Sequence, residues 1–140
     1  MEKTVNSVLS LDKLVFDKIE FKRNGMKNDN EIEFNLQVLI NKKQNEEIYR
    51  VTLILTGNKE KEYALEIALS GYFSFDASEE LDVEMKNTMI NQNAVAILMP
   101  YVRSQVSLLT AQPEVDCVVL PPFNIVKMMK MIRNIYVSIL

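Results

Sequence analysis

The residues that could act in catalysis are a group of carboxylates and one thiol. The acids are Glu79, Glu80, Asp82 and Glu84, and Cys117 is the single cysteine. Paired carboxylates can serve as general acid and base, but these acids open an apolar helical pattern, where negative charge stabilises the helix dipole. The sequence has no histidine to activate the thiol, and its three glycines form no phosphate-binding loop. We therefore predict no enzymatic activity, no cofactor and no metal site.

Binding of apolar surface is the other chemistry that the residues offer. The 8 methionines have flexible, polarisable side chains that adapt to varied apolar ligands. Met128 and Met129 lie with Ile132 on the apolar side of a last helix, which we expect to begin at Pro122. That side continues through Ile125, Ile135, Tyr136 and Ile139. A methionine stripe at helical spacing is also typical of a core, so both interpretations stay open.

A longer helical region precedes this last helix. Ser78 is the expected N-cap, and apolar residues then recur at helical spacing. Pro100 lacks a backbone N–H, so we expect the region to kink or split near it. The part from Ala94 to Ala111 carries more apolar surface than one sheet face can cover. This surplus predicts self-association or a groove for a partner.

Four segments with period-two alternation come first and predict β-strands. They lie at residues 14–23, 31–41, 49–55 and 63–69. A phase change between Phe16 and Ile19 predicts a bulge, residues 56–59 resemble a hairpin loop, and Gly71 interrupts the fourth strand. Short connections favour an antiparallel meander. The expected fold is α+β, a four-stranded antiparallel sheet with two to three helices packed on one face.

Length and composition bound the class of protein. The 140 residues predict one domain, residues 1–140. A net charge of -3 favours neither a nucleic-acid partner nor an anionic membrane. Residues 1–14 lack the pattern of a signal peptide, and no apolar run reaches the roughly 20 residues of a membrane span. A single cysteine forms no internal disulfide, so we expect a cytoplasmic protein.

Four motifs, taken in order, resemble the SecB family of protein-export chaperones. They are Glu31-Ile32-Glu33-Phe34-Asn35-Leu36, Gly71-Tyr72-Phe73-Ser74, Leu98-Met99-Pro100-Tyr101-Val102-Arg103 and Leu120-Pro121-Pro122-Phe123-Asn124. The ordered set spans nearly the whole chain, and Pro-Tyr-x-Arg followed by Pro-x-Asn is its most specific part. The resemblance implies a SecB-like fold and a homotetramer, a dimer of dimers, that holds unfolded polypeptides in apolar grooves without ATP.

The resemblance also implies roles for individual residues. Its candidates for the client-binding groove are Ile32, Phe34, Leu36, Met128, Met129 and Ile132. Its candidates for the oligomer interface are Ala94, Ile97, Leu98, Tyr101, Val102, Gln105 and Leu109. Glu66 matches an acid through which the family contacts the SecA motor, but Lys18 and Lys22 stand where the family has acids. The sequence also ends at Leu140 without the family's polar tail, and these departures disfavour SecA docking.

Three functions are the resulting hypotheses. The first is an ATP-independent holdase for many unfolded proteins, in the manner of a preprotein-export chaperone. The second is a dedicated chaperone of one partner such as an antitoxin, because the family includes solitary members attached to toxin–antitoxin systems. The third is a structural or assembly protein whose apolar helices only build an oligomer. Suppression of aggregation of several unrelated proteins distinguishes the first from the other two.

Overall fold

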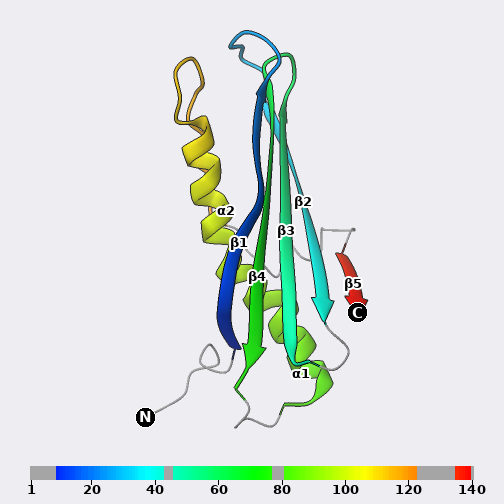
Figure 1. Ribbon diagram of the computed structural model, residues 1–140. Coiled ribbons are helices and arrows are strands. Elements are labelled where there is room, and N and C mark those ends of the chain that lie inside the picture. The colour runs from blue at the N-terminus through cyan, green and yellow to red at the C-terminus, as the bar shows by residue number, and fades with distance from the viewer. Residues whose placement is uncertain (1–8, 43–45, 77–80, 123–134, 140) are drawn as a thin grey trace.

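The structure is a computed structural model that describes residues 9–42, 46–76, 81–122 and 135–139 (Figure 1). Its strands are β1 Leu9–Arg23, β2 Ile32–Lys42, β3 Ile48–Lys59, β4 Tyr63–Phe75 and β5 Ile135–Ile139. Its helical segments are α1 Val83–Thr88, the π-helical η2 Met89–Ala94 and α2 Val95–Thr110. The fold is α+β, with helices over one face of a mainly antiparallel sheet, as the sequence predicted.

The strands lie in the order β1-β4-β3-β2-β5. The ladders β1–β4, β4–β3 and β3–β2 are antiparallel, whereas β5 runs parallel to β2. The meander prediction therefore holds for β2, β3 and β4 but is wrong for β1, which pairs with β4 and not with β2. The connection between β1 and β2 is long enough to cross the tip of the β3–β4 hairpin. There the backbone amides of Asn24 and Gly25 donate to the carbonyl of Glu62.

An ion pair buried under this crossing connection fixes it to the hairpin tip. The Glu62 side chain is fully buried, and its Oε1 accepts from the backbone amide of Asn28 at 2.8 Å. Lys59 Nζ lies 2.9 Å from the same Oε1 and also donates to the carbonyl of Asn28. The hydrogen bond from Lys59 holds the pKa of Glu62 below its usual range. The pair thus joins the hairpin tip to the connection between β1 and β2, two segments that are distant in sequence.

Local details of the sheet confirm one prediction and correct two. The register of β1 against β4 shifts between Phe16 and Lys18, where the phase change predicted a bulge, and again between Leu11 and Lys13. The hairpin loop predicted at residues 56–59 is wrong, because β3 pairs through Lys59 and the turn comes after it. Gly71 does not interrupt the fourth strand, because β4 runs without a break from Tyr63 to Phe75. Both corrections arise because cross-strand pairing outweighs a glycine's weak strand propensity.

Gly71 instead permits close packing of the helical layer. A Cβ at this position would lie 2.7 Å from Leu98 Cδ2 of α2 and 2.8 Å from Phe73 Cε2. Real Cβ atoms essentially never come that close to a heavy atom, so only glycine lets the helix approach the sheet here. The core lies between this face of the sheet and α2, where Leu98, Val102 and Val106 are fully buried.

The helical layer departs from the sequence predictions in two places. Ser78 lies outside the described residues, and the observed N-cap is Asp82, whose carboxylate accepts from the backbone amide of Met85 at 2.7 Å. Pro100 lies inside α2, which neither ends nor splits there. The irregularity is the π-helical turn of η2, which precedes α2. Such turns insert one extra residue into the helix and can redirect its axis.

The structure describes only the end of the segment in which we predicted the last helix. Residues 123–134 lie outside the described residues. Ile135, Tyr136 and Ile139, which we expected on the helix, belong to strand β5 instead. The segment Ile-Tyr-Val-Ser-Ile has high strand propensity, and the edge of β2 offers it unpaired backbone groups.

Candidate functional site

The inner face of β2 is the strongest candidate for a binding surface. Val38 and Ile40 are buried there, whereas Ile32, Phe34 and Leu36 on the same face are only partly buried. The reason is the placement of α2, which packs on β4 and β3. The three residues therefore form an apolar row that packs against the edge of the core and stays partly exposed, and we call it the β2 row.

The β2 row has a defined shape because a glycine faces its central residue. Phe34 pairs with Gly57 of β3, and a Cβ on Gly57 would lie 2.9 Å from Phe34 Cε1. The aromatic ring therefore rests over the backbone of β3. The other predicted groove residues, Met128, Met129 and Ile132, lie outside the described residues.

The predicted interface residues on α2 divide into two groups. Ala94, Leu98 and Val102 are fully buried against the protein's own sheet, so their side chains belong to the core of the protomer. The members that retain exposed surface are Ile97, Tyr101, Gln105 and Leu109. The side of α2 opposite the sheet is thus where a second molecule could make contact.

The interface candidates named from the sequence do not include the most exposed apolar residue of that side. Leu108 is 68% exposed and Tyr101 is 44% exposed. Together with Ile97 and Ser104 they recur at spacings of four, three and four residues, which places them on one stripe of the helix. We call Ile97, Tyr101, Ser104 and Leu108 the α2 ridge, which carries no charged side chain. The i, i+4, i+7, i+11 spacing was the signal that could have identified it.

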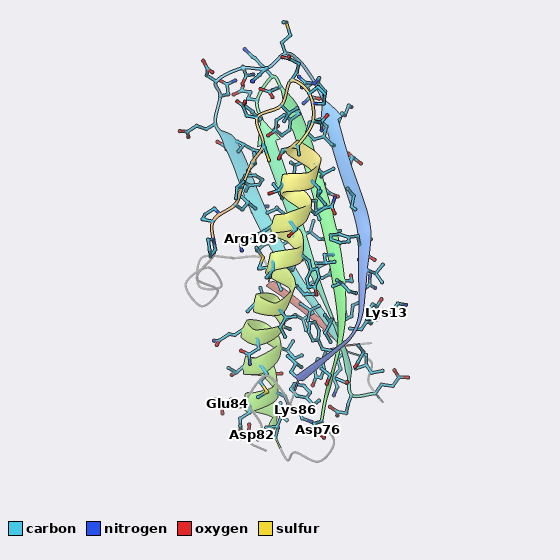
Figure 2. The ribbon with its side chains drawn as sticks, turned by 90° about the vertical axis from the view of Figure 1, so that its left-hand side faces the viewer. Lys13, Asp76, Asp82, Glu84, Lys86 and Arg103 are labelled. Atoms are coloured by element: carbon cyan, nitrogen blue, oxygen red, sulfur yellow. The ribbon has the colours of Figure 1, made fainter. Side chains whose placement is uncertain are left out.

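The segment after α2 holds the other flank of the helix. Arg103 Nε donates to the carbonyl of Leu120 at 3.1 Å, and Ser107 Oγ donates to the carbonyl of Val118 at 3.0 Å. The amide of Val118 donates in return to Thr110 Oγ1 at 2.8 Å. Figure 2 shows Arg103 on α2, with the segment passing beside the helix. Arg103, the arginine of the Pro-Tyr-x-Arg motif, therefore fixes the segment after α2 to the helix, and its charge does not lie on the ridge.

On the outer face of the sheet the single matching acid is already paired. Glu66 Oε2 lies 2.7 Å from Lys18 Nζ, and Lys18 also lies 3.7 Å from Glu20. The hydrogen bond from Glu66 raises the pKa of Lys18 above its usual value. Lys22, the second basic departure, stands on the same strand opposite Ala64. This surface therefore presents a neutralised carboxylate at the position of the predicted SecA contact.

A shallow hollow lies along the start of the helical layer. It is lined by Asp82, Glu84, Met85, Thr88, Met89 and Asn93. Met85 is 49% exposed, so this end of the layer also offers apolar surface. Figure 2 shows Asp82, Glu84 and Lys86 together at this end of the helix. Lys86 Nζ forms an ion pair with Glu47 Oε2 at 3.2 Å, and Asp82 is the N-cap of α1.

The thiol and the group of acids that could do covalent chemistry lie apart from one another or outside the described part of the chain. Glu79 and Glu80 lie outside the described residues, and the remaining acids of that group lie at the helix N-terminus. Cys117 is exposed, and its Sγ lies 3.7 Å from the carbonyl of Ser107. Among the described residues no group of three or more Asp, Glu, His or Cys side chains could hold a metal ion. In the same part of the chain no helix is both long and apolar enough to cross a membrane.

Comparison with known proteins identifies the family. The family model described as preprotein translocase subunit SecB matches residues 9–133. The chain belongs to the SecB family. An uncharacterised protein of Methanocaldococcus jannaschii is 29% identical over 144 residues, covering 96% of this chain and 91% of the relative.

A solved structure supports the same fold for this SecB-family protein. It is a SecB-like chaperone of Mycobacterium tuberculosis, determined in complex with a peptide from the HigA1 antitoxin. The TM-score is 0.70 at 10% sequence identity, and the match covers 86% of this chain and 91% of that chain. The resemblance that the motifs suggested is therefore confirmed for both family and fold.

Proposed function

We propose that this SecB-family protein is an ATP-independent holdase that binds unfolded or partly folded polypeptides on apolar surface. The observation that carries the proposal is the β2 row, a line of partly exposed apolar side chains beside the packed core. Unfolded chains expose apolar side chains that such a surface removes from water. We propose one domain over residues 1–140, in which Met128, Met129 and Ile132 also contribute to client binding.

Suppression of aggregation tests this function directly. Several unrelated proteins, diluted from denaturant into buffer without ATP, should aggregate less when the protein is present at micromolar concentration. Light scattering reports the aggregation, and an inert protein of similar size is the control. Failure to protect any of these clients would exclude a general holdase.

We also propose that the protein acts as a dimer of dimers, with the α2 ridge in an interface between copies. The ridge is uncharged and largely apolar over three turns, which is unusual for the solvent-facing side of a helix. Burial of such a stripe against its own copy is a common solution for a homo-oligomer. The native mass measured by light scattering, alone and with an unfolded client, tests this assembly.

A second candidate is a dedicated chaperone for one partner. The support is the fold shared with the Mycobacterium tuberculosis chaperone, whose structure holds an antitoxin peptide. The paired state of Glu66 and Lys18 also favours a role without SecA, because a neutralised acid attracts a basic partner weakly. This candidate predicts tight binding of one partner and no protection of unrelated clients. A stable oligomer that binds no unfolded chain would instead indicate an assembly protein.

A further inference from the structure

The connection between β1 and β2 begins with Asn24-Gly25, the one Asn-Gly pair in the sequence. Asparagine is a chemically labile residue. It deamidates fastest before glycine, because no side chain on the glycine hinders attack of the glycine nitrogen on the asparagine amide. Asn24 is exposed, so its side-chain amide is in contact with the water that the reaction consumes. Burial of the asparagine therefore does not protect this pair.

The fold requires the glycine of the pair. A Cβ at position 25 would overlap the carbonyl oxygen of Lys61, in the turn between β3 and β4, and would lie 3.2 Å from the carbon of that carbonyl. The obstacle is backbone, which cannot move aside as the end of a flexible side chain can. A larger residue would slow deamidation but would also push the connection away from the turn. The close approach of the two segments thus keeps a labile pair at this position.

The nitrogen that must attack is held by a hydrogen bond. The backbone amide of Gly25 donates to the carbonyl of Glu62 at 3.1 Å, and the amide of Asn24 donates to the same carbonyl at 2.7 Å. The carbonyl of Gly25 accepts from Arg23 Nη1 at 2.9 Å, and Arg23 Nη2 donates to the carbonyl of Glu114 at 2.6 Å. Gly25 is therefore fixed at both its amide and its carbonyl. Attack on the Asn24 side chain requires these bonds to break.

The residue that accepts both amides is itself anchored. The Glu62 side chain is fully buried, with Lys59 Nζ at 2.9 Å and the amide of Asn28 at 2.8 Å from its Oε1. Figure 1 shows the connection passing across the tip of the β3–β4 hairpin. Separation of a buried ion pair is costly, so this connection should open less often than an ordinary surface turn.

We propose that Asn24 is a deamidation site that the hairpin tip keeps unreactive, and that its reaction releases the connection from the tip. A bond forms between the Gly25 nitrogen and Cγ of Asn24. The bond from Cγ to the side-chain nitrogen breaks, and this nitrogen leaves as ammonia with the proton lost from Gly25. Water then opens the cyclic imide to aspartate or isoaspartate. Isoaspartate lengthens the main chain by one methylene, so the two amides no longer both reach the Glu62 carbonyl.

Comparison of the folded and unfolded protein tests the protection. Both are incubated at the same mildly alkaline pH and temperature, the unfolded sample in guanidinium chloride, and peptide mapping by mass spectrometry reports the converted fraction of Asn24. We expect the folded protein to react about tenfold or more slowly, because the reaction must wait for local opening. Equal rates in the two samples would overturn the protection.

A pair of variants shows whether the tip itself controls the rate. Arg23→Met keeps the length of the side chain but removes the donors to Gly25 and Glu114, and should raise the folded rate about threefold or more. The matched control is Val95→Ala, which truncates a fully buried residue at the start of α2 and should lower global stability without changing this rate. If both variants accelerate the reaction in proportion to their loss of stability, Asn24 reacts only through global unfolding, and the role of the tip is refuted.

Hydrogen exchange tests the release. The isoaspartate form is prepared by deamidation of the unfolded protein, refolded, and separated by chromatography. Its amides at Gly25 and Asn28 should exchange about tenfold or more faster than in the unmodified protein, whereas the amide of Leu53 in the central strand β3 should keep its protection. Unchanged exchange at Gly25 and Asn28 would show that the modified connection stays on the tip and would overturn the release.

Discussion

Truncation of Leu108 should dissociate the oligomer without unfolding the protomer. Leu108 is 68% exposed and lies on the uncharged α2 ridge. Leu108→Ala removes three carbons, worth about 0.8 kcal/mol each when fully buried. About two-thirds of this burial free energy, roughly 1.6 kcal/mol, can come from an interface, because the remaining third of the residue is already buried in the protomer.

In a two-fold interface the substitution occurs in both copies, so the loss of association free energy is doubled. If both copies of Leu108 are buried in one contact, the loss is about 3 kcal/mol per dimer, or roughly a hundredfold in dissociation constant. Sedimentation equilibrium over a range of protein concentrations measures this constant. Circular dichroism should show unchanged secondary structure, because the protomer's own core does not depend on the exposed part of this side chain.

Val119 provides the matched control. It is 75% exposed and lies on the segment after α2, which is not part of the α2 ridge. Val119→Ala should leave the dissociation constant within about twofold, since a surface truncation away from an interface typically changes little. An unchanged constant for Leu108→Ala, or an equal effect of both variants, would refute the assignment of the ridge to the interface.

Three further predictions concern stability and client binding. Gly71→Ala should lower the free energy of unfolding by about 1–3 kcal/mol, because the new methyl group collides with Leu98; urea denaturation measures it, and an unchanged midpoint would contradict the close packing. The depressed pKa of Glu62 means that its stabilising contribution is present above the unfolded value of 4.5 and is lost as the pH falls through the lower folded value. The urea midpoint should therefore fall in acid, and Glu62→Gln, which cannot ionise beside Lys59, should reduce that pH dependence. Phe34→Ala should weaken client binding by about 1–2 kcal/mol, roughly tenfold, with the oligomer intact; titration with an unfolded client measures it, and unchanged affinity would exclude Phe34 from the site.

The sequence by itself determined the features that local periodicity encodes. Alternating residues located four strands, and the phase change in the first strand located a bulge at Phe16, because side chains on a strand alternate faces strictly. Helical spacing located the long helical region around residues 94–110. The order of motifs such as Pro-Tyr-x-Arg indicated the family, which the match over residues 9–133 confirms.

Only the tertiary structure decided which elements meet. Alternating residues indicate that a strand has an apolar face, but they do not indicate which strand lies beside it. The pairing of β1 with β4 and of β5 with β2 could therefore not be predicted from the sequence. The same limit applies to the site. Leu98 and Phe34 are both apolar members of regular patterns, yet Leu98 is buried because Gly71 admits it to the sheet. Phe34 stays partly exposed because α2 packs on the neighbouring strands, and burial is a property of that arrangement rather than of the residue.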